Sequence, residues 1–160
     1  MKPSFPLAVV CATLLSLSAC GGGGDAGGSN ANVNVNNPAT LTKTDGAIGT
    51  GLEAVSGARV QVNYTGWVYS AGAAGFKGSQ FDASKPGKPF TFVVGASGTD
   101  ESVIPGFSQG VQGMKVGGKR TVLIPSTLGY GAAGVPGYIP GNTGLVFDVE
   151  LVKVCGSAAC

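Results

Sequence analysis

An alternation of apolar and polar side chains, with a period of two residues, recurs in several segments of the chain. It is clearest at 59–68, where Val60, Val62 and Tyr64 are separated by polar residues. The same period returns in three later segments, at 90–94, 120–124 and 145–151. Because successive side chains of a β-strand point to opposite faces of a sheet, each segment is predicted to be a strand with one buried face.

Only one segment has the pattern of a helix. Pro105–Met114 begins with a proline suited to a first helical turn and has Gly113 near its end. Phe107 and Val111 are four residues apart and would share one face. One short helix beside several strands predicts an α+β fold with an antiparallel sheet, and the 29 glycines and 9 prolines favour many turns.

The N-terminus has the features of an export signal. Lys2 precedes an apolar run at 7–17, which is too short to span a bilayer but suits the core of a signal peptide. The run ends in LSAC, which resembles the lipobox of bacterial lipoproteins, so we expect residues 1–19 to be removed and Cys20 to be lipidated. The alternative is an ordinary signal peptide with a chance cysteine. Gly21, rather than Asp, after the cysteine favours the outer membrane.

Residues 20–39 are predicted to be the lipidated cysteine followed by a tether. Their composition is mainly Gly, Asn, Ser and Ala, with little that is apolar enough to bury. The folded domain is therefore expected to cover 40–160, held at the membrane of a bacterial cell envelope and facing the periplasm or the cell surface.

The chain has four cysteines, two of which lie near its C-terminus. Cys11 would leave with the signal peptide and Cys20 would carry lipid, so Cys155 and Cys160 remain as a pair in an oxidising compartment. A disulfide between them is expected, with two free thiols as the alternative.

Several kinds of chemistry are excluded by composition. The chain has no histidine, which removes Ser-His-Asp and Cys-His sites and the usual zinc sites, and we expect neither a metal nor a cofactor. Residues 113–119 match the spacing of a phosphate-binding loop, but Arg120 stands where Ser or Thr should bind magnesium. A net charge of +2 without a basic run gives no sign of nucleic-acid binding.

Five sequence strings together resemble the FKBP-type peptidyl-prolyl cis-trans isomerases in order and spacing. They are VQVNYTG at 60–66, FDAS at 81–84, VIPGFSQGVQGMKVGGKR at 103–120, YGAAGVPGYIPG at 130–141 and LVFDVEL at 145–151. The resemblance covers about residues 40–154. It implies a roughly five-stranded antiparallel sheet wrapped around one short helix, and an isomerase that acts on X-Pro segments of other proteins and binds macrolide inhibitors.

The resemblance also implies which residues form the site. Those matched to the catalytic set are Tyr64, Phe81, Asp82, Ile104, Tyr130 and Phe147. Those matched to substrate binding are Phe90, Val103, Phe107, Tyr138 and Ile139. Phe107 would form the floor of an apolar pocket, and the Tyr130 hydroxyl would bind a substrate carbonyl. Tyr138 and Ile139 would lie on a long loop over the rim.

The chain departs from the family pattern in three places. The floor is Phe107 where the family often has Trp, which keeps an aromatic surface. The arginine that often pairs with the aspartate of the FDAS string is missing, so Lys85 is considered as a substitute and tight macrolide binding is less strongly implied. Insertions between Trp67 and Phe81 and between Gly95 and Val103 lengthen loops near the site.

Two main functions remain open on the sequence, with a structural surface lipoprotein as a further alternative. The first is an active isomerase that assists folding of exported proteins. The second is a proline-peptide binding or chaperone module with little catalysis, which would use the same aromatic pocket. No long N-terminal helix of the kind used by dimeric Mip-like relatives is evident, so a monomer is expected.

Overall fold

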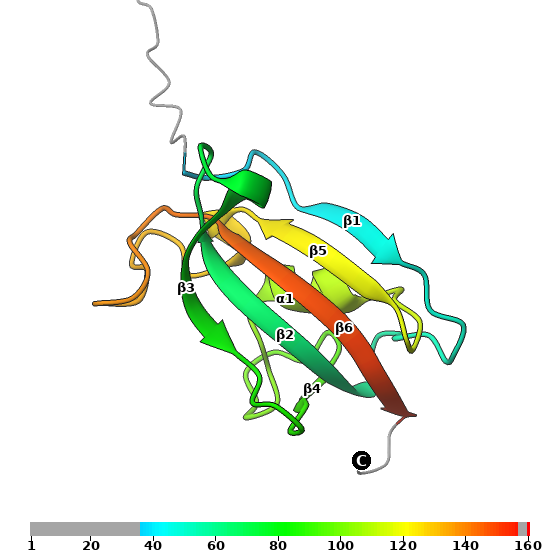
Figure 1. Ribbon diagram of the computed structural model, residues 1–160. Coiled ribbons are helices and arrows are strands. Elements are labelled where there is room, and N and C mark those ends of the chain that lie inside the picture. The colour runs from blue at the N-terminus through cyan, green and yellow to red at the C-terminus, as the bar shows by residue number, and fades with distance from the viewer. Residues whose placement is uncertain (1–35, 157–159) are drawn as a thin grey trace, which may run out of the picture. The chain divides into compact units, whose positions relative to one another are not determined.

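The computed structural model describes residues 36–156 and 160, all of which belong to one compact unit, Asn32–Cys160. In these residues a sheet of six antiparallel strands is joined by one α-helix and two short 3-10 helices (Figure 1). The elements are β1 (Thr42–Ala47), β2 (Arg59–Tyr69), η1 (Ala74–Phe76), β3 (Lys77–Ala83), β4 (Phe90–Val93), α1 (Pro105–Val111), β5 (Lys119–Ile124), η2 (Ser126–Leu128) and β6 (Leu145–Gly156).

The predicted fold class is confirmed, but the sheet has six strands instead of about five. The strand order is β1-β5-β6-β2-β3, and β4 also pairs with β2. β3 and β4 share one edge of β2, because β4 pairs with Arg59–Val62 and β3 pairs with Thr65–Tyr69. Thus β4 occupies the same side of β2 as β3 and does not widen the sheet.

Two strands had no signal in the sequence. All six residues of β1 are exposed, and β3 has no buried residue. A strand that buries neither face needs no apolar alternation, so the period of two that marks β2 and β6 is absent from them. They are defined by pairing with β5 and β2.

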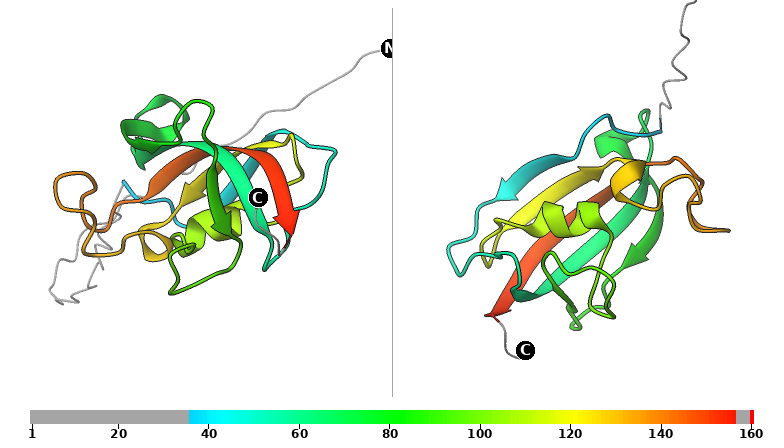
Figure 2. Two further views of the ribbon diagram at one scale, coloured as in Figure 1. Left: turned by 90° about the horizontal axis from the view of Figure 1, so that it is seen from below. Right: turned by 180° about the vertical axis from the view of Figure 1, so that it is seen from behind.

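The core lies between the sheet and α1, which crosses one face of the sheet (Figure 2). The alternating residues of β2 and β6 are turned towards it, with Val60, Val62 and Leu151 fully buried. On α1, a Cβ added at Gly106 would overlap Ile124, and one at Gly110 would lie 2.8 Å from Val122 Cγ1. Glycine at these two positions therefore allows the helix to lie close against β5.

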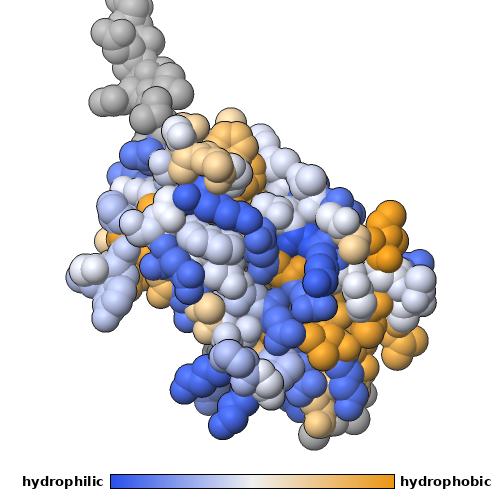
Figure 3. All heavy atoms as spheres, viewed as in Figure 1, coloured by the Kyte–Doolittle hydropathy of each residue, from blue (hydrophilic) through white to orange (hydrophobic). Residues whose placement is uncertain are grey.

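The opposite face of the sheet is polar. Hydrophilic residues are spread over it in Figure 3, which is viewed from the side away from α1. Lys77 Nζ lies 2.6 Å from Asp148 Oδ2, and Thr121 Oγ1 donates to Asp148 Oδ1 at 2.8 Å. One face of the sheet therefore packs and the other is solvated, as the alternation predicts.

The end of the predicted tether is packed on the domain. Pro38 is buried, and the Asn36 carbonyl accepts a 2.9 Å hydrogen bond from the Gly144 N–H. The folded unit therefore begins before residue 40, because this short segment supplies acceptors to backbone groups far along the chain. Cys20 lies outside the described residues.

At the other end, β6 runs to Gly156, beyond the predicted limit of Leu151. Cys155 and Cys160 form a disulfide with their Cα atoms 5.3 Å apart. Within the described residues, no helix is long and apolar enough to cross a membrane.

Candidate active site

A cavity of about 510 Å³ opens between the inner face of the sheet and the start of α1. It is lined by Tyr64, Phe81, Asp82, Phe90, Ser102, Val103, Ile104, Phe107, Tyr130 and Phe147. All but Ser102 are residues that the sequence resemblance selected. Segments far apart in the chain are thus brought to one site by the pairing of β2 with β6 and by the packing of α1.

Phe107 forms the floor of this cavity. Its side chain is only 4% exposed, and its ring centroid lies 5.5 Å from that of Tyr64 and 5.0 Å from that of Phe147. Both pairs are edge-to-face, the geometry that aromatic quadrupoles favour. The floor is therefore part of the hydrophobic core as well as a surface of the cavity.

Phe81 and Phe90 belong to the wall. The Phe81 ring meets Phe147 edge-to-face at 5.6 Å, and Phe90 meets Tyr64 in the same way at 5.6 Å. Phe90 is 38% exposed, so this side of the cavity borders solvent. An apolar chain entering the cavity would meet rings on several sides.

The cavity has few polar side chains, and two of them, Tyr64 and Asp82, are hydrogen-bonded to each other. The Tyr64 hydroxyl donates a 2.6 Å hydrogen bond to Asp82 Oδ2, and Asp82 Oδ1 accepts one of 2.9 Å from the Ala83 N–H. Burial, followed by the bond to the Asp82 carboxylate, raises the pKa of Tyr64 well above its ordinary value. Lys85 makes no ion pair with Asp82 in the described structure, so the substitute partner considered from the sequence is not used.

Tyr130 lies at the rim with 39% of its surface exposed. Burial of the remainder, with a smaller contribution from the Asp82 charge, raises the pKa of its hydroxyl. Both tyrosines are therefore neutral hydrogen-bonding groups at ordinary pH.

One of the lining residues also has a backbone donor without a partner among the described residues. Ile104 lines the cavity at the start of α1, and its N–H donates to no group in the part of the chain that the structure describes. Its carbonyl, in contrast, accepts hydrogen bonds from Phe107 and Ser108. An extended ligand could therefore bond to this N–H without displacing a protein contact.

A profile of the FKBP-type peptidyl-prolyl cis-trans isomerases matches residues 51–152. The chain belongs to this family. It is 44% identical over 107 residues to the FK506-binding protein of Neisseria meningitidis serogroup A, covering 66% of this chain and 88% of that protein. It is 46% identical over 110 residues to FK506-binding protein 4 of Emericella nidulans, covering 69% of this chain but only 20% of that longer protein.

Solved structures support the same family and fold. A peptidyl-prolyl cis-trans isomerase from Pseudomonas syringae pv. tomato is similar with a TM-score of 0.58 and 33% identity, over 71% of this chain and 74% of that one. FkpA from Escherichia coli is similar with a TM-score of 0.60 and 38% identity, over 74% of this chain and 49% of that one.

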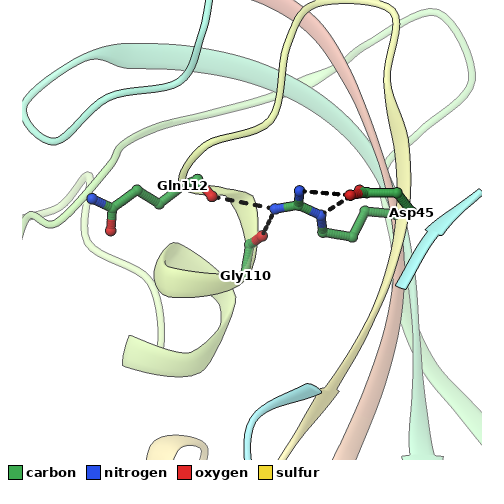
Figure 4. Close-up of polar contacts among 4 residues, drawn as sticks. Asp45, Gly110 and Gln112 are labelled. Carbon is green, nitrogen blue, oxygen red and sulfur yellow. Dashed lines mark hydrogen bonds and ion pairs between the residues drawn. The ribbon is translucent and has the colours of Figure 1, made fainter. Parts of the chain in front are cut away.

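In this FKBP domain, Arg120 of β5 holds the C-terminal end of α1 (Figure 4). Its Nη1 donates to the carbonyls of Gly110 at 2.8 Å and Gln112 at 3.2 Å. Asp45 of β1 accepts from the same guanidinium at 2.7 Å and 3.2 Å. The cation satisfies carbonyls that the helix leaves unpaired, so the helix carrying Phe107 is fixed at the end away from the cavity.

Tyr138 and Ile139, which the resemblance places on a loop over the rim, are not among the residues that line the cavity, and their part in substrate binding stays a prediction. Both lie on the long loop between η2 and β6, which projects from the FKBP domain in Figure 1. Tyr138 is 73% exposed, whereas Ile139 is 4% exposed and packs in the core. Their backbone groups bond to Val135 within the loop, and this local turn directs one side chain outward and the other inward.

The inserted loops contribute little to the cavity. The loop between β2 and β3 supplies no lining residue; its Phe76 ring stacks at 5.3 Å on the ring of Tyr69, the last residue of β2. From the other insertion only Ser102 reaches the cavity. Ser102 could not be selected beforehand, because its residue type and surroundings match no pattern.

No group of three or more potential metal ligands occurs in residues 36–156 and 160.

Proposed function

We propose that this FKBP domain catalyses cis-trans isomerisation of X-Pro bonds in other proteins. The observation that carries the proposal is the aromatic cavity closed by Phe107 at its base, with the Ile104 N–H, which donates to no described group, at its edge. A proline ring is compact and apolar and has no N–H, so it can enter such a cavity without losing a hydrogen bond.

The chemistry needs no nucleophile or proton transfer. The barrier of about 18–20 kcal/mol is the resonance energy lost when the peptide bond twists. The planar imide is more polar than the twisted one, so an apolar cavity favours the twisted form. Rotation is accelerated to the extent that the cavity binds the twisted form better than either planar isomer.

Two hydrogen-bond donors would orient the substrate. The Ile104 N–H is free to bond to a backbone carbonyl beside the proline, and the Tyr130 hydroxyl at the rim can donate to another. The Tyr64 hydroxyl is already engaged by Asp82, so its role is to complete a neutral wall.

The cavity is also proposed to accept macrolide inhibitors, since several relatives are named FK506-binding proteins. Asp82 has no cationic partner among the described residues. Its carboxylate is therefore held less rigidly than it would be by a bidentate arginine. We expect binding, with weaker affinity than an arginine-paired site would give.

We further propose that the domain acts on exported proteins while anchored to the bacterial envelope through lipidated Cys20. The LSAC string at 17–20 and the apolar run before it support this proposal. Uncatalysed isomerisation takes tens to hundreds of seconds, which is slow enough to limit folding in that compartment. Radiolabelled fatty acid should be incorporated by the parent protein and not by Cys20→Ser, and labelling of the variant would contradict the anchor.

The isomerase proposal is tested with a short X-Pro peptide in a protease-free assay. The parent protein should accelerate interconversion at catalytic concentrations, and Phe107→Leu should retain measurable turnover because it keeps the floor apolar. Binding of the peptide without any acceleration would favour the proline-binding alternative and reject the enzyme.

A further inference from the structure

A short segment before β1 contacts both ends of the loop that carries Tyr130. We define the strap as residues 36–38 and the site loop as residues 126–144. The Asn37 Oδ1 atom accepts a 2.8 Å hydrogen bond from the Ser126 N–H at the start of the site loop. The Asn36 carbonyl accepts one of 2.9 Å from the Gly144 N–H at its end.

The strap fits closely against the end of the site loop. A Cβ added at Gly144 would overlap Pro38 Cδ and would lie 3.1 Å from Asn37 Oδ1. Pro38 and Gly144 are both buried. The two ends of the loop are therefore joined through the strap by packing as well as by hydrogen bonds.

The Asn37 side chain satisfies the Ser126 N–H, which has no other acceptor among the described residues. Ser126 is 4% exposed and begins η2, and no side chain caps this helix from its N-cap residue, Pro125. A buried N–H without an acceptor is unfavourable, so loss of the Asn37 oxygen would shift Ser126 towards water.

The position of Ser126 in turn sets the backbone around Tyr130. The Ser126 carbonyl accepts hydrogen bonds from the N–H groups of Gly129 at 3.0 Å and Gly131 at 2.9 Å. These two residues flank Tyr130 directly. A displacement of Ser126 is therefore transmitted to both sides of the tyrosine whose hydroxyl lies at the cavity rim.

We propose that Asn37 is a positioning residue for Tyr130, acting through Ser126. The inference rests on the proposed function, in which the Tyr130 hydroxyl binds the substrate. The strap lies outside residues 51–152, which match the family, yet it helps to hold the site in place.

The first experiment compares single variants in the full chain. Asn37→Ala removes the acceptor and should lower kcat/KM by about fivefold through a raised KM. Asn37→Asp keeps an acceptor oxygen in the same place and should restore kcat/KM to within about twofold of the parent. Asn63→Ala is the matched control, because it removes only a 3.5 Å bond to Glu150 on the outer face of the sheet.

The second experiment repeats Asn37→Ala in a Tyr130→Phe background. If Asn37 acts through the tyrosine hydroxyl, its removal should then lower kcat/KM by less than about twofold. The same factor in both backgrounds would mean that the two residues act independently and would overturn the inference.

Hydrogen exchange separates this inference from the proposed function. The Gly129 and Gly131 amides should exchange at least about tenfold faster in Asn37→Ala than in the parent or in Asn63→Ala. Unchanged exchange overturns the inference whatever the activity. If the parent protein shows no isomerisation, the proposed function fails, and the exchange rates alone decide whether the strap holds the site loop.

Discussion

The floor and the rim of the cavity are held in place by different interactions. At the floor, Phe107 is packed against Tyr64 and Phe147 by ring contacts within the core. At the rim, Tyr130 is 39% exposed and is positioned mainly by backbone hydrogen bonds of its loop. The floor should therefore couple activity to stability, whereas the rim should affect activity with little change in the free energy of unfolding.

The largest expected effect is at the floor. Phe107→Ala should lower the free energy of unfolding by about 3–5 kcal/mol, because it leaves a cavity among buried rings. Isomerase activity should fall at the same time. Urea denaturation measures the first effect and a peptide assay the second. A variant with parental stability would show that the floor is not part of the core.

Phe81→Ala tests the wall, where the expected effect is intermediate between that at the floor and that at the rim. Phe81 is partly buried and contacts Phe147 at 5.6 Å, so its loss should admit water to the cavity. We expect kcat/KM to fall about tenfold, corresponding to about 1.4 kcal/mol of transition-state stabilisation. The loss of stability should be smaller than for Phe107→Ala. Parental kcat/KM in this variant would contradict a mechanism based on an apolar cavity.

Tyr130→Phe tests the rim. It removes one hydrogen bond of about 0.5–1.5 kcal/mol and leaves the ring in place, so kcat/KM should fall less than tenfold. The free energy of unfolding should change by no more than about 0.5 kcal/mol. A destabilisation as large as that of Phe107→Ala would contradict the view that the floor, but not the rim, contributes strongly to stability.

The smallest expected effect is that of pH. Burial raises the pKa of both Tyr64 and Tyr130, so the neutral phenols are favoured in the folded protein. The preference for neutral phenols stabilises the folded protein fully below the unfolded-state pKa of about 10, and this stabilisation decreases as pH rises above that value. Between about pH 6 and 8, kcat/KM should therefore be constant. A bell-shaped profile in that range would indicate proton transfer and reject the mechanism.

Much of the fold follows from local pattern. The alternation at 59–68 and 145–151 identified β2 and β6, and the proline and spaced apolar residues of 105–114 identified α1. Each of these elements buries one face, so apolar residues recur in its sequence with the repeat of a strand or a helix. The family strings likewise identified most residues of the cavity, because each cavity element has a recognisable local sequence.

The rest depended on contacts between distant segments. β1 and β3 bury no apolar face, so only pairing with neighbouring strands defines them. Tyr138 and Ile139 are adjacent in sequence, yet a turn exposes one and buries the other.

What the sequence alone determined is therefore the family, the main strands, the helix and the aromatic character of the site. Only the tertiary structure decided how the site is supported. Arg120 reaches carbonyls of α1, and Asn37 meets Ser126, which is 89 residues further along the chain. Such hydrogen bonds leave no periodic trace, because a single polar residue is sufficient and its partner is a backbone group that every sequence contains.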